Sequence, residues 1–146
     1  MPCINSQMTA LGPTIPVLVL PSAPRIQALL AAGMPMPLPV TGTFLIDTGA
    51  SSTVVDDQFV APLGLQPTSM VGMHTPSTNG VVQQCNLYDV QIVIAAPNSV
   101  PFVINALAVM EASLRPQGID GLIGRDVLDR TCLIYNGTAQ TFSLAF

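Results

Sequence analysis

The sequence contains no lysine, no tryptophan and few charged residues of either sign. Charged residues make up 8% of the 146 residues, whereas they make up about a quarter of an ordinary soluble domain. The four arginines, Arg25, Arg115, Arg125 and Arg130, form no run, and the net charge is −4. Because a protein that binds nucleic acid needs a basic surface, we expect no nucleic-acid partner.

The scarcity of charge also bears on the oligomeric state. Apolar residues make up 49% of the chain, and too few charged residues remain to cover the surface of a monomer. Large exposed apolar patches commonly mark contacts with another subunit. We therefore expect a second copy of the chain to cover part of the surface. The alternative is a monomer with an unusually apolar exterior.

Cysteine and histidine are scarce as well. Cys3, Cys85 and Cys132 are odd in number, and with a single histidine they match no zinc-site spacing. We expect free thiols and no zinc site. The first residues show no basic segment followed by an apolar stretch, and proline or glycine interrupts the apolar runs. These patterns predict neither a signal peptide nor a membrane span, and we expect a cytoplasmic, reducing location.

The pattern of apolar residues predicts a mainly β domain, a barrel or a sandwich, built from short strands. Residues 1–12 are weakly patterned and are expected to be peripheral or loose. Residues 13–22 resemble an edge strand bounded by prolines, and residues 22–33 a short helix with Ser22 as its N-cap. The segments expected to form later strands are residues 41–47, 52–60, 68–75, 80–95 and 100–110, with a strand and short helix at residues 119–130. Residues 132–146 are expected to form a hairpin of two strands joined by an Asn-Gly turn.

The segment from Phe44 to Val55, FLIDTGASSTVV, carries the clearest chemical signal. Three apolar residues lead directly into Asp47, and a carboxylate at the end of a buried strand is costly unless it is paired or used. Small and polar residues follow it, so the backbone is free to turn close to the carboxylate. Two adjacent carboxylates that share a proton are able to activate water and to protonate a leaving group.

Two motifs in this chain resemble those of aspartic proteases. Asp47-Thr48-Gly49-Ala50-Ser51 looks like the catalytic motif of that family, and residues 121–128, GLIGRDVL, resemble the C-terminal segment of retroviral proteases. Both motifs, the intervening hairpin and the closing strand occur in the family order over residues 41–146. On this basis the chain is identified as similar to the retropepsin-like aspartic proteases, of a bacterial or other non-viral branch.

The resemblance implies a fold and a domain organisation. The fold would be a closed acid-protease-type barrel with a β-hairpin flap and one or two short helices, forming half of a two-fold dimer. Residues 13–146 would be a single domain with a helical insertion near residues 22–33.

The resemblance also implies roles for particular residues. Asp47 would be the catalytic aspartate, held by Thr48, Gly49, Ala50 and Ser51. The flap, in contact with substrate, would include His74, Thr75, Pro76, Ser77 and Thr78, and the floor of the site would include Leu122, Ile123 and Gly124. Retroviral proteases carry an acid at the position of Ser51 that pairs with the arginine of the C-terminal segment, so the role of Arg125 stays open.

The partner of Asp47 is not evident within the chain, which has one Asp-Thr-Gly motif. Asp120 is expected to be a turn residue before a strand, and Asp56 and Asp57 solvated turn acids. Asp89 is expected to be a surface residue and Asp126 a helix-start residue. The partner would therefore be Asp47 of a second subunit across a two-fold axis. The predicted function is a homodimeric aspartic endopeptidase that cleaves peptide or protein substrates and needs no metal or organic cofactor. The alternative is a non-catalytic, dimeric peptide-binding module that retains the protease fold.

Overall fold

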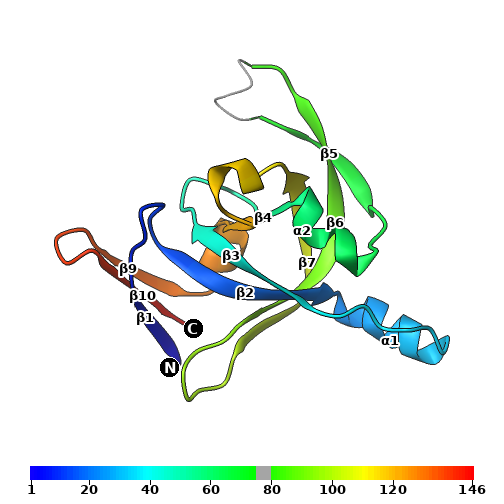
Figure 1. The fold of residues 1–146 in the computed structure, drawn as a ribbon, viewed down its shortest axis with the longest axis horizontal. Helices are drawn as coiled ribbons and strands as arrows, with labels where there is room; N and C mark the ends of the chain where they lie inside the picture. Colours follow the sequence, from blue (N-terminus) through cyan, green and yellow to red (C-terminus); the bar gives the residue numbers. More distant parts are fainter. Residues whose placement is uncertain (75–79) are drawn as a thin grey trace.

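The computed structural model describes residues 1–74 and 80–146 and shows a barrel with a separate small sheet beside it (Figure 1). The larger sheet has seven strands in the order β2-β3-β8-β4-β7-β6-β5, and β2 also pairs with β6. This extra pairing closes six of the strands into a barrel and leaves β5 outside the ring. The small sheet has the order β1-β10-β9. The expected mainly β, closed-barrel fold is thus confirmed.

Most of the regular structure consists of strands, and the helices are few and short. The strands are β1 (Cys3–Gln7), β2 (Thr14–Pro21), β3 (Val40–Ile46), β4 (Val54–Asp56), β5 (Ser69–Met73), β6 (Gln83–Ile94), β7 (Phe102–Ala112), β8 (Gly121–Ile123), β9 (Cys132–Asn136) and β10 (Thr141–Ala145). The helices are α1 (Ala23–Ala31), α2 (Asp57–Val60) and α3 (Arg125–Leu128), with 3₁₀ turns η1 (Ala61–Leu63) and η3 (Arg115–Gln117).

The barrel encloses the main apolar core. Alternate residues of β2, among them Val17 and Val19, are fully buried together with Phe44 of β3 and Val90 and Ile92 of β6. This alternation is what a strand with one face toward a core requires. Burial of these side chains is the main favourable contribution to folding.

Strand β2 differs from its expected position at a sheet edge. It pairs with β3 from Thr14 to Val19 and with β6 from Leu18 to Pro21, so it closes the barrel. Pro16, which lacks an N–H donor, lies before the stretch that pairs on both sides. Proline is tolerated at this position because β2 pairs there with β3 alone, so a residue without an N–H can face the unpaired side of the strand.

The N-terminal segment is more ordered than its weak pattern suggested. Strand β1 pairs antiparallel with β10, with Cys3 opposite Ala145, and is therefore a paired strand rather than a loose segment. The N–H of Phe146 donates to the carbonyl of Pro2 at 3.1 Å, so the two ends of the chain lie together (Figure 1). Strands β9 and β10 form the expected C-terminal hairpin.

Two further segments test the expected helices and strands. Helix α1 confirms the helix expected near residues 22–33; it begins after Ser22, whose carbonyl accepts the N–H of Ile26 at 2.9 Å. The strand expected over residues 52–60 is wrong in its second half, because it stops at Asp56 and residues 57–60 form α2. The Asp56 side chain accepts the N–H groups of Gln58 and Phe59 and so starts the helix.

The expected long hairpin is present as β5 and β6, which pair antiparallel from Ser69–Leu87 to Met73–Gln83. It projects from the barrel at the end opposite the small sheet (Figure 1). His74 follows β5 and is exposed. The other residues expected in the flap, Thr75, Pro76, Ser77 and Thr78, lie outside the described residues. None of the helices in the described parts of the chain is long and apolar enough to cross a membrane.

Candidate active site

Asp47 lies directly after β3 and is held at both its backbone and its side chain. Its N–H donates to the carbonyl of Ile123 in β8 at 3.0 Å. Its carboxylate Oδ1 accepts the N–H of Gly49 at 2.8 Å. Strands β3 and β8 run parallel, with Ile46 beside Ile123, so the carboxylate emerges where two buried strands reach the surface. Asp47 is half-buried, while Thr48 and Gly49 are exposed.

The first turn of α3 holds the loop that follows Asp47. The N–H of Arg125 donates to the carbonyl of Ala50 at 3.0 Å, and the N–H of Asp126 to that of Ser51 at 3.3 Å. The guanidinium Nη1 of Arg125 donates to the carbonyl of Thr48 at 2.9 Å. The role of Arg125 was left open because Ser51 provides no acid for it to pair with. In the structure, the guanidinium of Arg125 binds the backbone of the aspartate loop directly.

Gly124 permits this close approach between α3 and the loop. A Cβ atom at Gly124 would lie 2.5 Å from the carbonyl carbon of Ser52 and 2.9 Å from the backbone nitrogen of Thr53. Neither of these backbone atoms is able to move without displacing the loop. Glycine is required at this position for steric reasons.

A Gly124→Ala variant is expected to lose about 1–3 kcal/mol of unfolding free energy, because the added methyl group overpacks a backbone contact. Denaturant unfolding measures this loss. Gly137→Ala, in the turn between β9 and β10, is the matched control, since its Cβ would make an ordinary contact of 3.5 Å with the Tyr135 ring. Equal stability of the Gly124→Ala and Gly137→Ala variants would contradict the close approach.

The other expected floor residues divide between two roles. The side chain of Ile123 is fully buried in the main core, and its carbonyl anchors Asp47. Leu122 points to the opposite side of the strand and joins a second apolar cluster with Val54 and Leu114. Neighbouring strands place Leu45, Leu122, Val54 and Met110 in one row across β3, β8, β4 and β7. An apolar row therefore begins two residues before Asp47.

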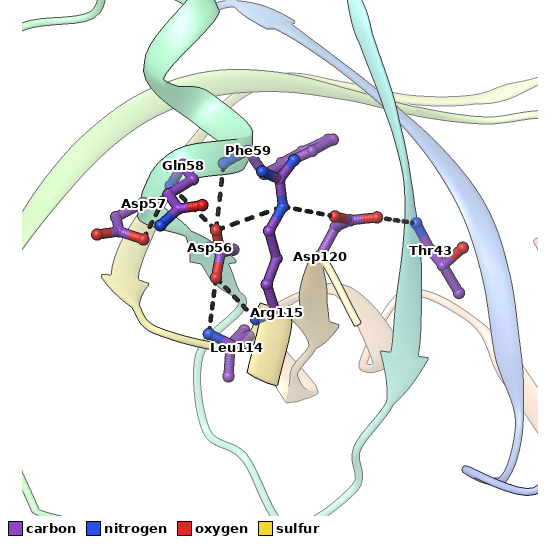
Figure 2. Close-up of polar contacts among 8 residues, drawn as sticks. All are labelled: Thr43, Asp56, Asp57, Gln58, Phe59, Leu114, Arg115 and Asp120. Atoms are coloured by element: carbon purple, nitrogen blue, oxygen red, sulfur yellow. Dashed lines mark hydrogen bonds and ion pairs between the residues drawn. The ribbon is translucent and has the colours of Figure 1, made fainter. Parts of the chain in front are cut away.

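Asp56 corrects the expectation of a solvated turn acid, because its side chain is 1% exposed. Figure 2 shows the polar contacts around its carboxylate. Oδ1 accepts the N–H groups of Gln58 and Phe59 at 3.0 and 3.2 Å. Oδ2 accepts those of Leu114 and Arg115 at 2.7 and 2.8 Å. Burial by itself would raise the pKa of this carboxyl group, but the four N–H donors outweigh it and lower the pKa.

Asp120 lies beside the same network, as Figure 2 shows. Its Oδ1 is 3.3 Å from Nε of Arg115, and its Oδ2 accepts the N–H of Thr43 at 2.9 Å. The expected position before β8 is correct, and the carboxylate ties β3 to η3. Asp57 and Asp89 are exposed, as expected of both. Within residues 1–74 and 80–146, no hydrogen bond joins Asp47 to another acid.

Two residues behind the loop were given no role in the site by the sequence pattern. Asp126, at the start of α3, accepts both the N–H and the hydroxyl of Thr53 at 2.8 and 2.7 Å. Thr53 is fully buried. A polar residue directly before the apolar pair Val54-Val55 was an available signal, but its partner is 73 residues away in the chain.

Two surface grooves lie away from this region. One, of about 370 Å³, is lined by α1, the proline-rich segment at residues 35–37 and residues 62–65. The other, of about 330 Å³, is lined by Ser22, Arg25, residues 65–68 and Asp89. No residue of the Asp47 loop contributes to either of these grooves.

Comparison with known proteins agrees with this geometry. Residues 38–127, more than half of the chain, match a family model described as aspartyl protease. A retropepsin-like aspartic protease from Rickettsia conorii has a similar fold, with a TM-score of 0.60 and 14% sequence identity. The alignment covers 99% of this chain and 90% of that one. The search of curated proteins finds no significant match. The chain belongs to the aspartyl protease family and has the retropepsin-like fold that its two motifs predicted.

Proposed function

We propose that this aspartyl protease family member is an endopeptidase whose catalytic pair consists of Asp47 from each of two copies. The observation that carries the proposal is the placement of Asp47. It stands half-exposed at the end of β3, fixed by Ile123 and Gly49, in a chain with one Asp-Thr-Gly motif. A two-fold axis next to this loop brings the same carboxylate of each copy together.

Two such carboxylates divide the chemistry between them. Close carboxylates share one proton, the behaviour known from aspartic proteases. The ionised carboxylate takes a proton from water as the water oxygen bonds to the peptide carbonyl carbon. The protonated one supplies a proton to the leaving nitrogen when the C–N bond breaks. The N–H of Gly49 on Oδ1 orients the carboxylate for this exchange.

The exterior of the chain supports a homodimer. Ile134 and Tyr135 on β9 are each 60% exposed, and β9 is an outer strand of the small sheet. Thr48 and Gly49 are exposed beside Asp47. The low charge content adds to these features, since a second copy would cover apolar surface.

Substrate would bind along the apolar row that begins at Leu45, with the β5–β6 hairpin as the flap. The partly buried members of this row, Leu45, Leu122 and Met110, favour substrates with apolar side chains near the scissile bond. The flap would include His74 and residues 75–78, and the peptide would lie extended as an added strand.

The three free cysteines support a reducing, cytoplasmic location.

The first experiment is digestion of a mixed peptide library across a range of pH, read by mass spectrometry. Wild-type protein and Asp47→Ala are compared at equal concentration. Cuts made by the wild type alone support the proposal and define the residues preferred around the cleaved bond. Absence of cutting in a protein that sediments as a dimer would favour the peptide-binding module. Identical cuts by both proteins would remove Asp47 from the mechanism.

Subunit mixing tests the shared site. Because each site needs two Asp47 residues, a threefold excess of Asp47→Asn protein, after exchange of subunits, should reduce wild-type activity to about a quarter. The reduction follows from the fraction of wild-type chains that still meet a wild-type partner. The control adds the same excess of Asp47→Asn without time for exchange. Unchanged activity after complete exchange would mean that one chain forms the whole site.

A further inference from the structure

We propose that Asp126 is a positioning residue for Asp47, acting through the buried hydroxyl of Thr53. The proposal rests on the proposed function, because positioning has a meaning there only if Asp47 is catalytic. Its physical basis is independent of activity, since it lies in a set of hydrogen bonds between α3 and the far end of the aspartate loop.

The carboxylate of Asp126 has three hydrogen-bond donors. Its Oδ2 accepts the N–H of Thr53 at 2.8 Å. Its Oδ1 accepts the hydroxyl of Thr53 at 2.7 Å and the N–H of Val127 at 2.9 Å. Hydrogen bonds to an ionised acceptor are stronger than those between neutral groups. Asp126 therefore binds both polar groups that Thr53 presents to it.

The hydroxyl of Thr53 connects Asp126 to Gly124, one of the residues expected in the floor of the site. Since its proton goes to Asp126, its oxygen is available as an acceptor, and it accepts the N–H of Gly124 at 3.2 Å. Thr53 is fully buried, so water cannot replace either partner. One hydroxyl thus connects a side chain of α3 to the backbone that precedes the helix.

This connection lies next to the anchor of Asp47. The carbonyl of Ile123, directly before Gly124, accepts the N–H of Asp47. Residues 123–126 consequently hold both ends of the loop, Asp47 at one end and Thr53 at the other. Loss of the Thr53 end leaves the loop tied by Arg125 and by the backbone bonds at Ala50 and Ser51. The loop would then stay close to its original position, but the position of the Asp47 carboxylate would be less precisely fixed.

An amide at position 126 does not reproduce these contacts. Asn has one acceptor oxygen and an NH₂ group that is a donor. In one orientation the NH₂ group faces the N–H of Thr53, and in the other it faces the N–H of Val127. Asp126→Asn therefore removes an acceptor and places two donors together, with almost no change in size.

The experiment compares Asp126→Asn with Asp129→Asn, an exposed acid at the other end of α3. Asp126→Asn should lower kcat between about 10- and 100-fold with little change in KM, because a small displacement of a reacting group affects the transition state most. Hydrogen exchange in peptides that cover residues 48–53 should become faster. Asp129→Asn should match the wild type in both measurements.

Thr53 supplies a second, independent pair of variants. Thr53→Val, which removes the hydroxyl at nearly constant volume, should reproduce the fall in kcat, and Thr53→Ser, which keeps it, should retain most of the activity. The double variant Asp126→Asn/Thr53→Val should lose less than the product of the two single losses, since both break one network. If Asp126→Asn does not fold, the comparison of Thr53→Val with Thr53→Ser tests the proposal.

The outcomes separate this proposal from the proposed function. If wild type and Asp47→Asn are equally inactive on all peptides, the proposed function fails, and hydrogen exchange alone tests the network. Faster exchange at residues 48–53 in Asp126→Asn would still support the link to the loop. Wild-type exchange and kcat in Asp126→Asn, or equal kcat in Thr53→Val and Thr53→Ser, would overturn the proposal.

Discussion

Replacement of Asp47 with asparagine is expected to reduce peptide cleavage by about 10³-fold or more, because an amide cannot take a proton from water or deliver one to the leaving nitrogen. The fold should persist. The amide oxygen of asparagine is able to accept the N–H of Gly49, as Oδ1 of Asp47 does at 2.8 Å. The bond from the backbone N–H of residue 47 to Ile123 is unaffected.

Self-association provides a second readout for the same variant, because the proposed function brings two Asp47 residues together. Two carboxylates brought together repel when both are ionised, so Asp47→Asn should dimerise at least as tightly as the wild type at neutral pH. Sedimentation across a concentration series measures this. Asp89→Asn, on the exposed face of β6, removes one charge elsewhere and should change neither property. Cleavage by Asp47→Asn at the wild-type rate would refute the catalytic assignment.

Replacement of Asp56 with asparagine is expected to cost about 2–4 kcal/mol of unfolding free energy at neutral pH. Each carboxylate oxygen accepts two backbone N–H groups, one pair from α2 and the other from Leu114 and Arg115. The NH₂ group of asparagine must face one of these pairs. Buried donors then lose their acceptor and meet another donor.

The cost of this replacement should depend on pH. The pKa of Asp56 in the folded state lies below its usual value of 3.8. Its contribution to stability is therefore fully present above 3.8 and is lost as the pH falls through the folded-state pKa. The difference between wild type and Asp56→Asn should shrink in that acid range. Denaturant unfolding of both proteins at neutral and acid pH measures it.

A matched control is available next to this site. Asp57 is exposed and accepts the N–H of Gln58 at 2.8 Å, so Asp57→Asn should cost less than about 1 kcal/mol. If Asp56→Asn and Asp57→Asn were equally stable, or if the effect of Asp56→Asn did not change with pH, the four-donor arrangement would be wrong.

The features that the sequence predicted well are those that depend on residues close together in the chain. The apolar run from Phe44 to Ile46, followed by small and polar residues, located the Asp47 loop. The β5–β6 and β9–β10 hairpins and helix α1 were visible from apolar periodicity, prolines and turn residues. Gly124 was included in the floor by resemblance, and the backbone contact at Ser52 gives the physical reason.

The features that sequence analysis misjudged depend on partners far along the chain. Asp56 has the local pattern of a turn acid, and the donors that allow its burial include Leu114, 58 residues away. Strand β2 has the prolines of an edge strand, but β6 pairs with its second half. Strand β1 is weakly patterned because it belongs to a small sheet with much exposed surface.

By itself, the sequence located the Asp47 loop, because an apolar strand leads directly into it and the small residues that follow let the backbone turn. The tertiary structure decided how that loop is held. The Arg125 guanidinium reaches Thr48 across 77 residues, and the Asp126 carboxylate reaches Thr53 across 73. Such bonds exist only after β8 has paired with β3 and β4, since it is this pairing that brings the start of α3 beneath the loop.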